Sequence, residues 1–407
     1  MPFNNDLTRL LGVTSPIVLG PMANASGGEL AAATSLGGGF GFLGAGYWDA
    51  ATVKSHFQTA RALMEQGGLS PKRKNARLTL GIGFLVWRLT KVHGSPVSSA
   101  SLTSDAEGIY SPAIEIVEAA LRARPKSIWL SFGEADDLVA WADFIRKRDA
   151  QLSAELSANG EAEEDDPLVI MVGVGTEQQA RQAVESVGCD VLSVTGQESG
   201  GHGMAASPTL FTLLPRVAHI LPTLKPRQDA GTVLDRPLLI GAGGLSSGAS
   251  LAALLALGAQ GAVFGTRYLL TPEAMYTSGQ KDLLKTLGSA SSHGDNKKDE
   301  PAGDHLTLRS MAFDDARGTL DWPAGVDGRG IRNQTVIEYE ADKSAASQSN
   351  RQKRYTQAAE EKDVNRLITW AGTGVGVMED IVPAKELTER LTREAEEALQ
   401  RTRGQVV

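Results

Sequence analysis

Short runs of consecutive apolar residues recur through the first two thirds of the chain, with little polar alternation inside them. Strands buried on both faces of a parallel sheet show this pattern, because helices cover both of their faces. About eight runs are present, which is the number of strands at which a barrel closes with a packed interior. They span residues 17–19, 40–43, 78–84, 128–130, 168–172, 191–194, 238–240 and 262–264.

Segments with helical periodicity separate these runs. In the segment at 247–257, Leu251, Leu254 and Leu255 share one face, and Gly258 is placed to end the helix. A strand and helix unit repeated about eight times favours a closed (β/α)8 TIM barrel over an open doubly wound sheet. The helical segments include residues 28–36, 111–123, 136–147, 177–187 and 247–257.

Three polar stretches interrupt this rhythm. Residues 153–166 are acidic and poor in apolar side chains, and residues 287–304 mix Gly, Ser, Lys and Asp. Residues 67–76 form a shorter polar stretch. Such compositions bury too little apolar surface to order a segment, so we expect all three to be mobile surface loops.

The strand and helix rhythm also stops beyond about residue 306, and the tail ends in a charged amphipathic helix at 384–402. We therefore expect a barrel over residues 1–286 that carries the acidic insertion at 153–166. A flexible loop at 287–304 would then lead to a C-terminal segment, 305–407, that packs across the barrel as a helical cap.

Composition narrows the class of protein. The 407 residues include 42% hydrophobic side chains, enough for a sizeable core, and carry a net charge of −8. An acidic chain lacks the clustered Lys and Arg typical of nucleic-acid binding. The single cysteine, Cys189, excludes an intrachain disulfide framework and is expected to be a small buried hydrophobe. Paired histidines and cysteine clusters are missing from the sequence, so no metal site is predicted.

The sequence gives no sign of membrane attachment. No apolar run reaches the roughly 18 residues that a transmembrane helix needs, and residues 1–6 lack the charged and then apolar pattern of a signal peptide. A cytoplasmic location is the expectation. The sequence does not specify an oligomeric state.

Two glycine-rich loops follow the last two predicted strands, where TIM barrels usually bind phosphate. Residues 241–244 read Gly-Ala-Gly-Gly and precede a helix that starts near Ser246 or Ser247, so backbone N–H groups would converge there on an anion. Residues 265–267 read Gly-Thr-Arg and offer a close-approach glycine, a hydroxyl and a cation. Either loop alone is a weak signal, but together they predict a phosphorylated ligand.

His202 ends another glycine-rich loop, which follows the strand at 191–194. Its neighbours Gly201 and Gly203 argue against packing as a core residue, and an imidazole with a pKa near 6.5 can accept a proton from a weakly acidic carbon near neutral pH. The remaining histidines lie in helices or polar loops and are expected to be structural: His56, His93, His219, His293 and His305.

In combination these motifs resemble the nitronate monooxygenase family, formerly called 2-nitropropane dioxygenases, which are FMN flavoproteins on a TIM barrel. The resemblance rests on residues 16–23, 36–41, 196–202, 242–244 and 261–267. Motifs in the tail are similar to those of fungal-type members, at residues 322–323, 327–329, 333 and 370–376.

The resemblance implies an oxidoreductase that oxidises a small nitronate or nitroalkane with dioxygen. It implies that His202 is the catalytic base toward neutral nitroalkanes. Members commonly have glutamine where this chain has Thr195 and Val263, and valine cannot hydrogen-bond the cofactor. The residues that the resemblance assigns to FMN are Met22, Ala23, Gly83, Thr195, Gly200, Gly201, Gly243, Gly244, Gly265 and Thr266.

Other functions fit the same residues. An FMN-dependent enoyl-thioester reductase using NAD(P)H carries a closely similar Gly-Gly-His loop, and a tailoring oxidoreductase acting on a larger natural product is a version of the same class. A flavin-binding protein without turnover is motivated by Thr195 and Val263. A non-redox barrel could hold a substrate phosphate in the same cup, although no lysine ends any predicted strand to form a Schiff base.

Overall fold

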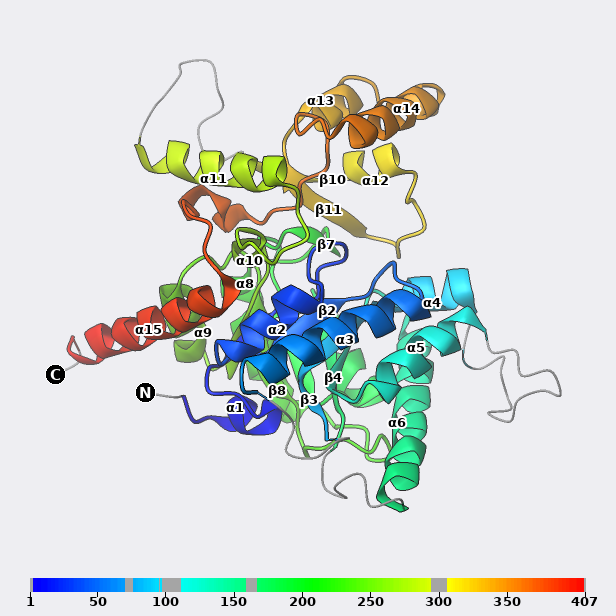
Figure 1. Cartoon of the computed structure of the whole chain (residues 1–407), viewed down its shortest axis with the longest axis vertical. Helices are drawn as coiled ribbons and strands as arrows, with labels where there is room; N and C mark the ends of the chain where they lie inside the picture. The colour runs from blue at the N-terminus through cyan, green and yellow to red at the C-terminus, as the bar shows by residue number, and fades with distance from the viewer. Residues whose placement is uncertain are drawn as a thin grey trace.

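The computed structural model describes residues 3–69, 76–94, 96, 111–158, 167–293 and 306–405. Eight parallel strands form one sheet in the order β1-β9-β8-β6-β5-β4-β3-β2. Backbone hydrogen bonds from Leu19 N to Phe40 O and from Phe40 N to Ile17 O join β1 to the start of β2 and close the sheet. The predicted TIM barrel is therefore confirmed (Figure 1). Its strands are β1 (Ile17–Leu19), β2 (Gly41–Gly44), β3 (Leu78–Leu85), β4 (Pro125–Ser131), β5 (Val169–Val174), β6 (Val191–Thr195), β8 (Leu238–Ala242) and β9 (Gly261–Phe264).

The strands bury both of their faces, which explains their continuous apolar runs. Val18 points into the barrel, while Ile17 and Leu19 on either side of it pack outward against helices. Inside the barrel, the rings of Phe42 and Trp129 meet edge to face with centroids 5.4 Å apart. A side chain at Gly81 would lie 2.3 Å from the Phe42 ring, so this position must remain glycine.

Helices surround the barrel in the order of the strands. The ring consists of α2 (Gly28–Leu36), α3 (Ala50–Gln66), α4 (Val86–His93), α5 (Pro112–Arg122), α6 (Ala135–Ala158), α7 (Glu177–Gln182), α8 (Leu210–Ile220) and α9 (Gly248–Ala256). A π-helical turn, Ala183–Val187, extends α7. At the amino ends of the strands, α1 (Asp6–Leu11) covers the barrel with Leu7 and Leu11. Among the described helices, none is both long enough and apolar enough to span a bilayer.

The helix position after β9, the last strand of the barrel, is taken by the C-terminal helix, α15 (Ala384–Arg403). After β9 the chain makes only one helical turn, α10 (Thr266–Leu269), before α11 (Ser278–His293) leaves the barrel. α15 then packs on α9 and α2, and buries Leu387, Leu391 and Ala395 (Figure 1). We expected the whole of residues 305–407 to pack across the barrel as a cap. α15 instead joins the ring of helices, because the gap between α2 and α9 accepts its apolar stripe.

A carboxylate of α15 occupies the N-terminus of α9. The N–H of Gly248 donates to Glu394 Oε2 at 2.8 Å, and a side chain at Gly248 would lie 2.2 Å from the Leu391 carbonyl oxygen. The sequence predicted that this helix start would face a ligand phosphate. That prediction is wrong, because the anion at this helix start belongs to the protein.

We expect Glu394→Ala to lower the free energy of unfolding by about 1 kcal/mol, the usual effect of removing a helix cap. The cavity described below should be unaffected, because Glu394 is not among the residues that line it. Urea unfolding of the purified variant measures the loss of stability. An unchanged free energy of unfolding would contradict this account of α9.

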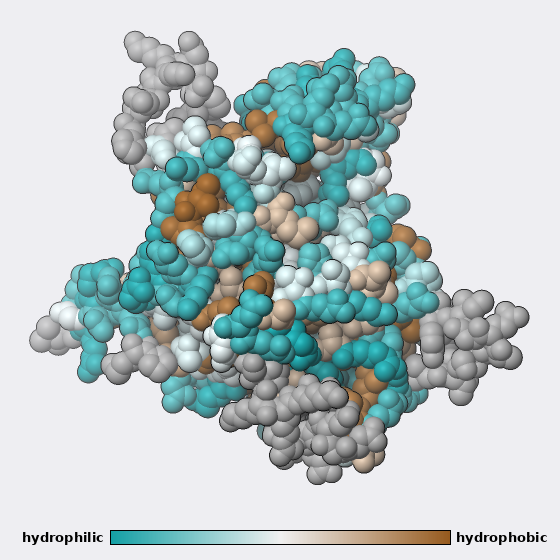
Figure 2. Space-filling view, in the orientation of Figure 1, coloured by the Kyte–Doolittle hydropathy of each residue, from teal (hydrophilic) through white to brown (hydrophobic). Residues whose placement is uncertain are grey.

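A cap stands over the carboxyl ends of the barrel strands. A three-stranded antiparallel sheet, in the order β10-β11-β7, joins it to the barrel. The cap consists of β7 (Gly201–Met204), β10 (Thr307–Ser310), β11 (Val326–Ile331), α11, α12 (Ala312–Arg317), α13 (Gln334–Ala341), α14 (Ala345–Glu361) and a 3₁₀ turn at Thr373–Val377 (Figure 1). The outer surface of α13 and α14 is mostly hydrophilic (Figure 2).

Parts of two stretches expected to be loops are helical. Residues 153–158 belong to α6, which buries Leu152 and directs Ser153 to accept a hydrogen bond from Arg124. Residues 287–293 belong to α11, where Gly288 packs against the backbone of Met378. In both cases a tertiary contact extends the helix into a polar sequence. Residues 159–166 and 294–304, and positions 70–75 of the shorter stretch, lie outside the described residues.

Candidate active site

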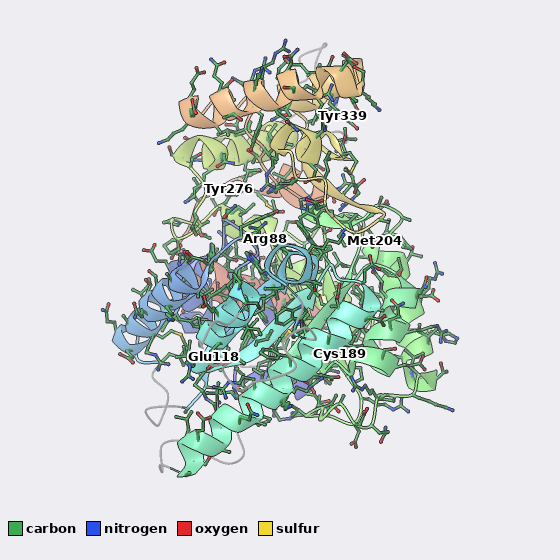
Figure 3. All side chains as sticks on the ribbon, turned by 90° about the vertical axis from the view of Figure 1, so that its right-hand side faces the viewer. Arg88, Glu118, Cys189, Met204, Tyr276 and Tyr339 are labelled. Carbon is green, nitrogen blue, oxygen red and sulfur yellow. The ribbon has the colours of Figure 1, made fainter. Side chains whose placement is uncertain are left out.

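A cavity of about 440 Å³ lies between the carboxyl ends of the barrel strands and the cap. Figure 3 shows Tyr276, Arg88 and Met204 at this level, while Cys189 lies further from the cap, just before the amino end of β6. Cys189 is buried, as expected, and burial raises the pKa of its thiol to about 12. His202 and all the residues that the family resemblance assigns to FMN line the cavity: Met22, Ala23, Gly83, Thr195, Gly200, Gly201, Gly243, Gly244, Gly265 and Thr266.

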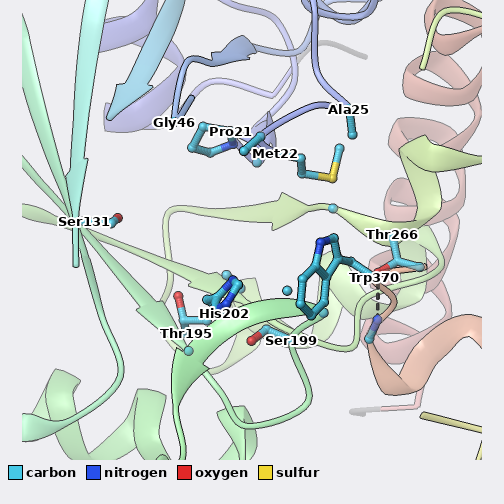
Figure 4. Close-up of a pocket in the computed structure, with 18 of the residues that line it drawn as sticks. Pro21, Met22, Ala25, Gly46, Ser131, Thr195, Ser199, His202, Thr266 and Trp370 are labelled. Atoms are coloured by element: carbon cyan, nitrogen blue, oxygen red, sulfur yellow. Dashed lines mark hydrogen bonds between the residues drawn. The ribbon is translucent and has the colours of Figure 1, made fainter. Parts of the chain in front are cut away.

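Glycines keep the barrel side of the cavity open. A side chain at Gly83 would lie 2.4 Å from Pro21, and one at Gly173 would lie 2.6 Å from the hydroxyl of Ser131. Pro21 and Met22 face His202 across the space (Figure 4). Small residues on these strands therefore leave room for a flat group between the barrel floor and His202.

Backbone groups line the end of the cavity that is formed by the loops after β8 and β9. Gly243 and Gly244 have φ values of 119° and 71°, a region that side chains rarely adopt. No acceptor in the described part of the chain takes their N–H groups. The Thr266 hydroxyl accepts a hydrogen bond from Gly372 N at 2.9 Å and retains its own proton for donation (Figure 4).

Arg267 is not part of this end of the cavity. Its guanidinium is buried and pairs with the carboxylate and, at 3.2 Å, the carbonyl oxygen of Asp380. The expectation that Arg267 offers a cation to a ligand is therefore wrong. The cup consists of amides and one hydroxyl, and we use the name phosphate cup below for Gly243, Gly244, Gly265 and Thr266.

The glycine-rich loop before His202 is fixed from two sides. The Glu198 carboxylate accepts hydrogen bonds from Leu210 N at 2.9 and 3.0 Å, which caps α8. Thr373 N donates to the carbonyl of Glu198, and a side chain at Gly200 would lie 2.5 Å from Gly372 N. The motif at 370–376 thus fits against the motif at 196–202, which explains why both occur in one chain.

His202 projects from β7, where it pairs with Gly328 of β11. Its Nε2 lies 2.9 and 3.0 Å from the two carboxylate oxygens of Asp314, which is fully buried and also accepts a 2.8 Å hydrogen bond from the Thr319 hydroxyl. An ionised carboxylate only accepts, so Nε2 donates and Nδ1 carries the lone pair. No residue that the structure describes hydrogen-bonds Nδ1, which leaves it available to a substrate.

Aromatic rings hold the imidazole on its faces. Trp322 stacks on His202 with centroids 3.6 Å apart and planes 10° apart, and the Trp370 centroid lies 4.9 Å away. Phe132 meets Trp322 edge to face and has a φ of 58°, which is uncommon for an aromatic residue. These contacts restrict rotation of the His202 ring.

Burial lowers the pKa of His202, and hydrogen bonding to Asp314 partly offsets that effect. The nearby charges of Arg317 and Arg309 lower this pKa further. The imidazole is therefore unprotonated at neutral pH, which is the state that a general base requires.

If His202 removes a proton from a neutral substrate, Asp314→Asn is expected to slow that step by about 100-fold or more. The amide can donate to Nε2 and thereby place the ring proton on Nδ1, which is the wrong tautomer for a base. The rate with a substrate that is already ionised should change much less. Steady-state kinetics with both substrate forms check this prediction, and equal losses with both would contradict it.

Asp314 was not found from the sequence, although it is the polar partner of His202. It lies 112 residues away in a short helix, where an aspartate carries no special signal. Trp322 and Trp370 belong to the motifs of the tail, but the sequence alone indicates no role for either of them in the site. Thr195 and Val263 line the cavity, so a hydroxyl and an apolar side chain replace the two usual glutamines.

His56 is structural as expected, because it stacks on Trp48 and accepts a hydrogen bond from Gly28 N. His305 lies outside the described residues. Within the described ranges, no group of three or more His, Cys, Asp or Glu side chains could hold a metal ion.

Comparisons relate the chain to known proteins. Residues 152–291 match the family model described as nitronate monooxygenase. The nitronate monooxygenase of Neurospora crassa is 26% identical over 385 residues, which cover 95% of this chain and 90% of that protein. Two solved structures share the fold. FabK from Thermotoga maritima has a TM-score of 0.66 at 20% identity, covering 99% of this chain and 100% of that one.

The nitroalkane oxidase from Streptomyces ansochromogenes has a TM-score of 0.63 at 23% identity, covering 98% of this chain and 100% of that one. Sequence similarity to the Neurospora protein thus extends over almost the whole chain, well beyond the residues that the family model matches. Together with the motifs at 16–23, 196–202 and 370–376, these similarities identify the chain as an oxidoreductase related to the nitronate monooxygenases.

Proposed function

We propose that this protein uses FMN to oxidise alkyl nitronates with dioxygen, and that it also accepts neutral nitroalkanes after His202 has removed a proton. One observation carries the proposal. His202 has Nε2 held by the buried Asp314 and Nδ1 free, in a cavity that also holds the phosphate cup.

The cavity fits an FMN molecule. Its volume lies within the roughly 300–1,000 Å³ of ligand sites, and FMN needs a flat slot beside an anion site. Gly243, Gly244, Gly265 and Thr266 would hold the phosphate through backbone N–H groups and one hydroxyl. The ring would lie among the residues of the barrel floor and the His202 loop, namely Met22, Ala23, Gly83, Thr195, Gly200 and Gly201.

The protein's own part in the reaction is proton transfer and placement. His202 Nδ1 accepts the proton alpha to the nitro group, and the Asp314 carboxylate stabilises the imidazolium that results. Trp322, stacked on the ring, and Asp314, bonded to Nε2, hold the imidazole in one orientation. When bound, FMN supplies the redox chemistry, accepting electrons from the nitronate and passing them to dioxygen.

Dioxygen consumption by the purified, FMN-loaded protein tests this function. We expect consumption with ethyl nitronate, and slower consumption with neutral nitroethane. An enoyl thioester that stimulates NAD(P)H oxidation, with no response to nitronate, would instead identify the reductase. Bound FMN that responds to neither substrate would identify a flavin-binding protein without turnover.

A further inference from the structure

Arg317 is a cationic side chain in the cavity wall that has no acidic partner. It ends α12, one turn after Asp314, and is half-buried. In the part of the chain that the structure describes, no carboxylate pairs with its guanidinium and no hydrogen bond engages it. Its contact is with the ring of Tyr47, whose centroid lies 5.3 Å away.

Two other arginines of the cap are neutralised by carboxylates. Arg309 pairs with Asp327 at 3.1 Å, and Arg351 pairs with Asp315 at 2.6 Å. Removing a guanidinium from water is costly unless an anion compensates it. Arg88 is also half-buried without a carboxylate partner in the described part of the chain, but only Arg317 of the two lines the cavity, where an anion from outside the protein can reach it.

The groups around Arg317 suit an anion of small size. Tyr47, Tyr276 and Tyr355 line the same cavity, and the Tyr47 hydroxyl is buried without a hydrogen-bond partner. Burial lowers the pKa of His202 and raises the pKa of Tyr276 and of Tyr355, and the positive charge of Arg317 acts on all three groups, adding to the first shift and opposing the other two. Arg317 is thus within electrostatic range of the place where His202 would meet a substrate.

We propose that Arg317 binds the two oxygens of the nitro group and stabilises the negative charge that they gain. This inference rests on the proposed function. As the carbon-hydrogen bond breaks, its proton goes to His202 Nδ1, its electron pair forms the carbon-nitrogen double bond, and the charge moves to the oxygens. A guanidinium presents paired N–H donors in a planar fork, which matches a planar pair of oxygens.

Arg317→Met and Arg317→Lys test this assignment, with Arg88→Met as the matched control. Arg88 lies over the same Tyr47 ring at 4.9 Å but is not among the residues that line the cavity. We expect Arg317→Met to raise the KM for ethyl nitronate on the order of 10- to 100-fold, the range for a lost charged hydrogen bond. The KM of Arg317→Lys should lie between those of the wild type and Arg317→Met, because lysine keeps the charge but lacks the planar pair of N–H donors. Arg88→Met should change KM less than about threefold.

Nitrate binding to the flavin-loaded protein provides a readout without turnover. Nitrate is a planar oxyanion that cannot be deprotonated, and its Kd can be measured from quenching of tryptophan fluorescence, since Trp322 and Trp370 border the site. The same loss of affinity should appear in Arg317→Met and not in Arg88→Met. Thermal melting of each variant shows whether it is folded.

The outcomes separate this inference from the proposed function. Nitrate binding that depends on Arg317, in a protein that does not oxidise nitronate, would refute the function and leave the anion site standing. Folded Arg317→Met with unchanged nitrate Kd and nitronate KM would overturn the inference. An effect confined to a nitronate with a second, carboxylate group would also overturn it, because Arg317 would then bind the carboxylate and not the nitro oxygens.

Discussion

Replacing His202 by alanine is expected to reduce kcat/KM for neutral nitroethane by about 10²- to 10⁴-fold, the usual contribution of a general base. The rate with ethyl nitronate, whose proton has already gone, should remain within about tenfold of the wild-type rate. The difference arises because only the neutral substrate needs Nδ1 as a proton acceptor. Paired measurements of dioxygen consumption with the two substrates give both values.

His219→Ala is the matched control for this experiment. His219 lies exposed on α8, and it is not among the residues that line the cavity. Both rates should be unchanged in this variant. A His202→Ala enzyme that loses both rates equally would show that the imidazole shapes the cavity and is not a base.

The pH profile adds a second check on His202. Activity with a neutral nitroalkane should rise with pH as the imidazole loses its proton, and reach a plateau above the pKa of His202. Burial lowers that pKa, so the midpoint of the rise should lie below the ordinary value of about 6.5. The same rise should be missing with His202→Ala, and a midpoint well above that value would contradict the buried, unprotonated state described here.

Gly243→Ala is expected to weaken FMN binding by about tenfold or more. An alanine there must adopt a φ of 119°, and its Cβ would lie 3.2 Å from both Gly196 O and Ser199 N. The loop at 243–244 would have to move, and the amides that would hold the phosphate move with it. Titration of the flavin-free protein with FMN, followed by quenching of flavin fluorescence, measures the Kd.

Gly258→Ala is the control for this experiment, because it introduces backbone strain without touching the phosphate cup. Gly258 also has a positive φ, 94°, in the same strand and helix unit, but a Cβ there would meet nothing within 4 Å. Both variants should lose about 1–2 kcal/mol of folding stability, the cost of a left-handed residue. Only Gly243→Ala should lose FMN, and wild-type FMN affinity in that variant would refute the assignment of the cup.

The barrel could be predicted from the sequence because its main signal is local. Burial on both faces leaves continuous apolar runs, and each predicted run overlaps one of the observed strands. The loops after these strands were also placed correctly around one cavity, because the carboxyl ends of parallel strands meet at one end of a barrel.

The positions that could not be predicted depend on partners distant in the sequence. The apolar stripe of α15 shows that one face is buried, but not that it fills the gap between α2 and α9. In the same way, the charges of Arg267 and Glu394 look like ligand-binding or surface groups until Asp380 and Gly248 N are seen beside them. Asp314 reaches His202 only because β11 and α12 fold back over the barrel mouth.

The most direct test of the nitronate reaction is the visible spectrum of the purified, FMN-loaded protein as ethyl nitronate is added without oxygen. We predict that the flavin absorbance bleaches within the mixing time of a manual experiment and returns when oxygen is admitted. A flavin spectrum that nitronate leaves unchanged, but that NAD(P)H bleaches, would contradict the proposed function.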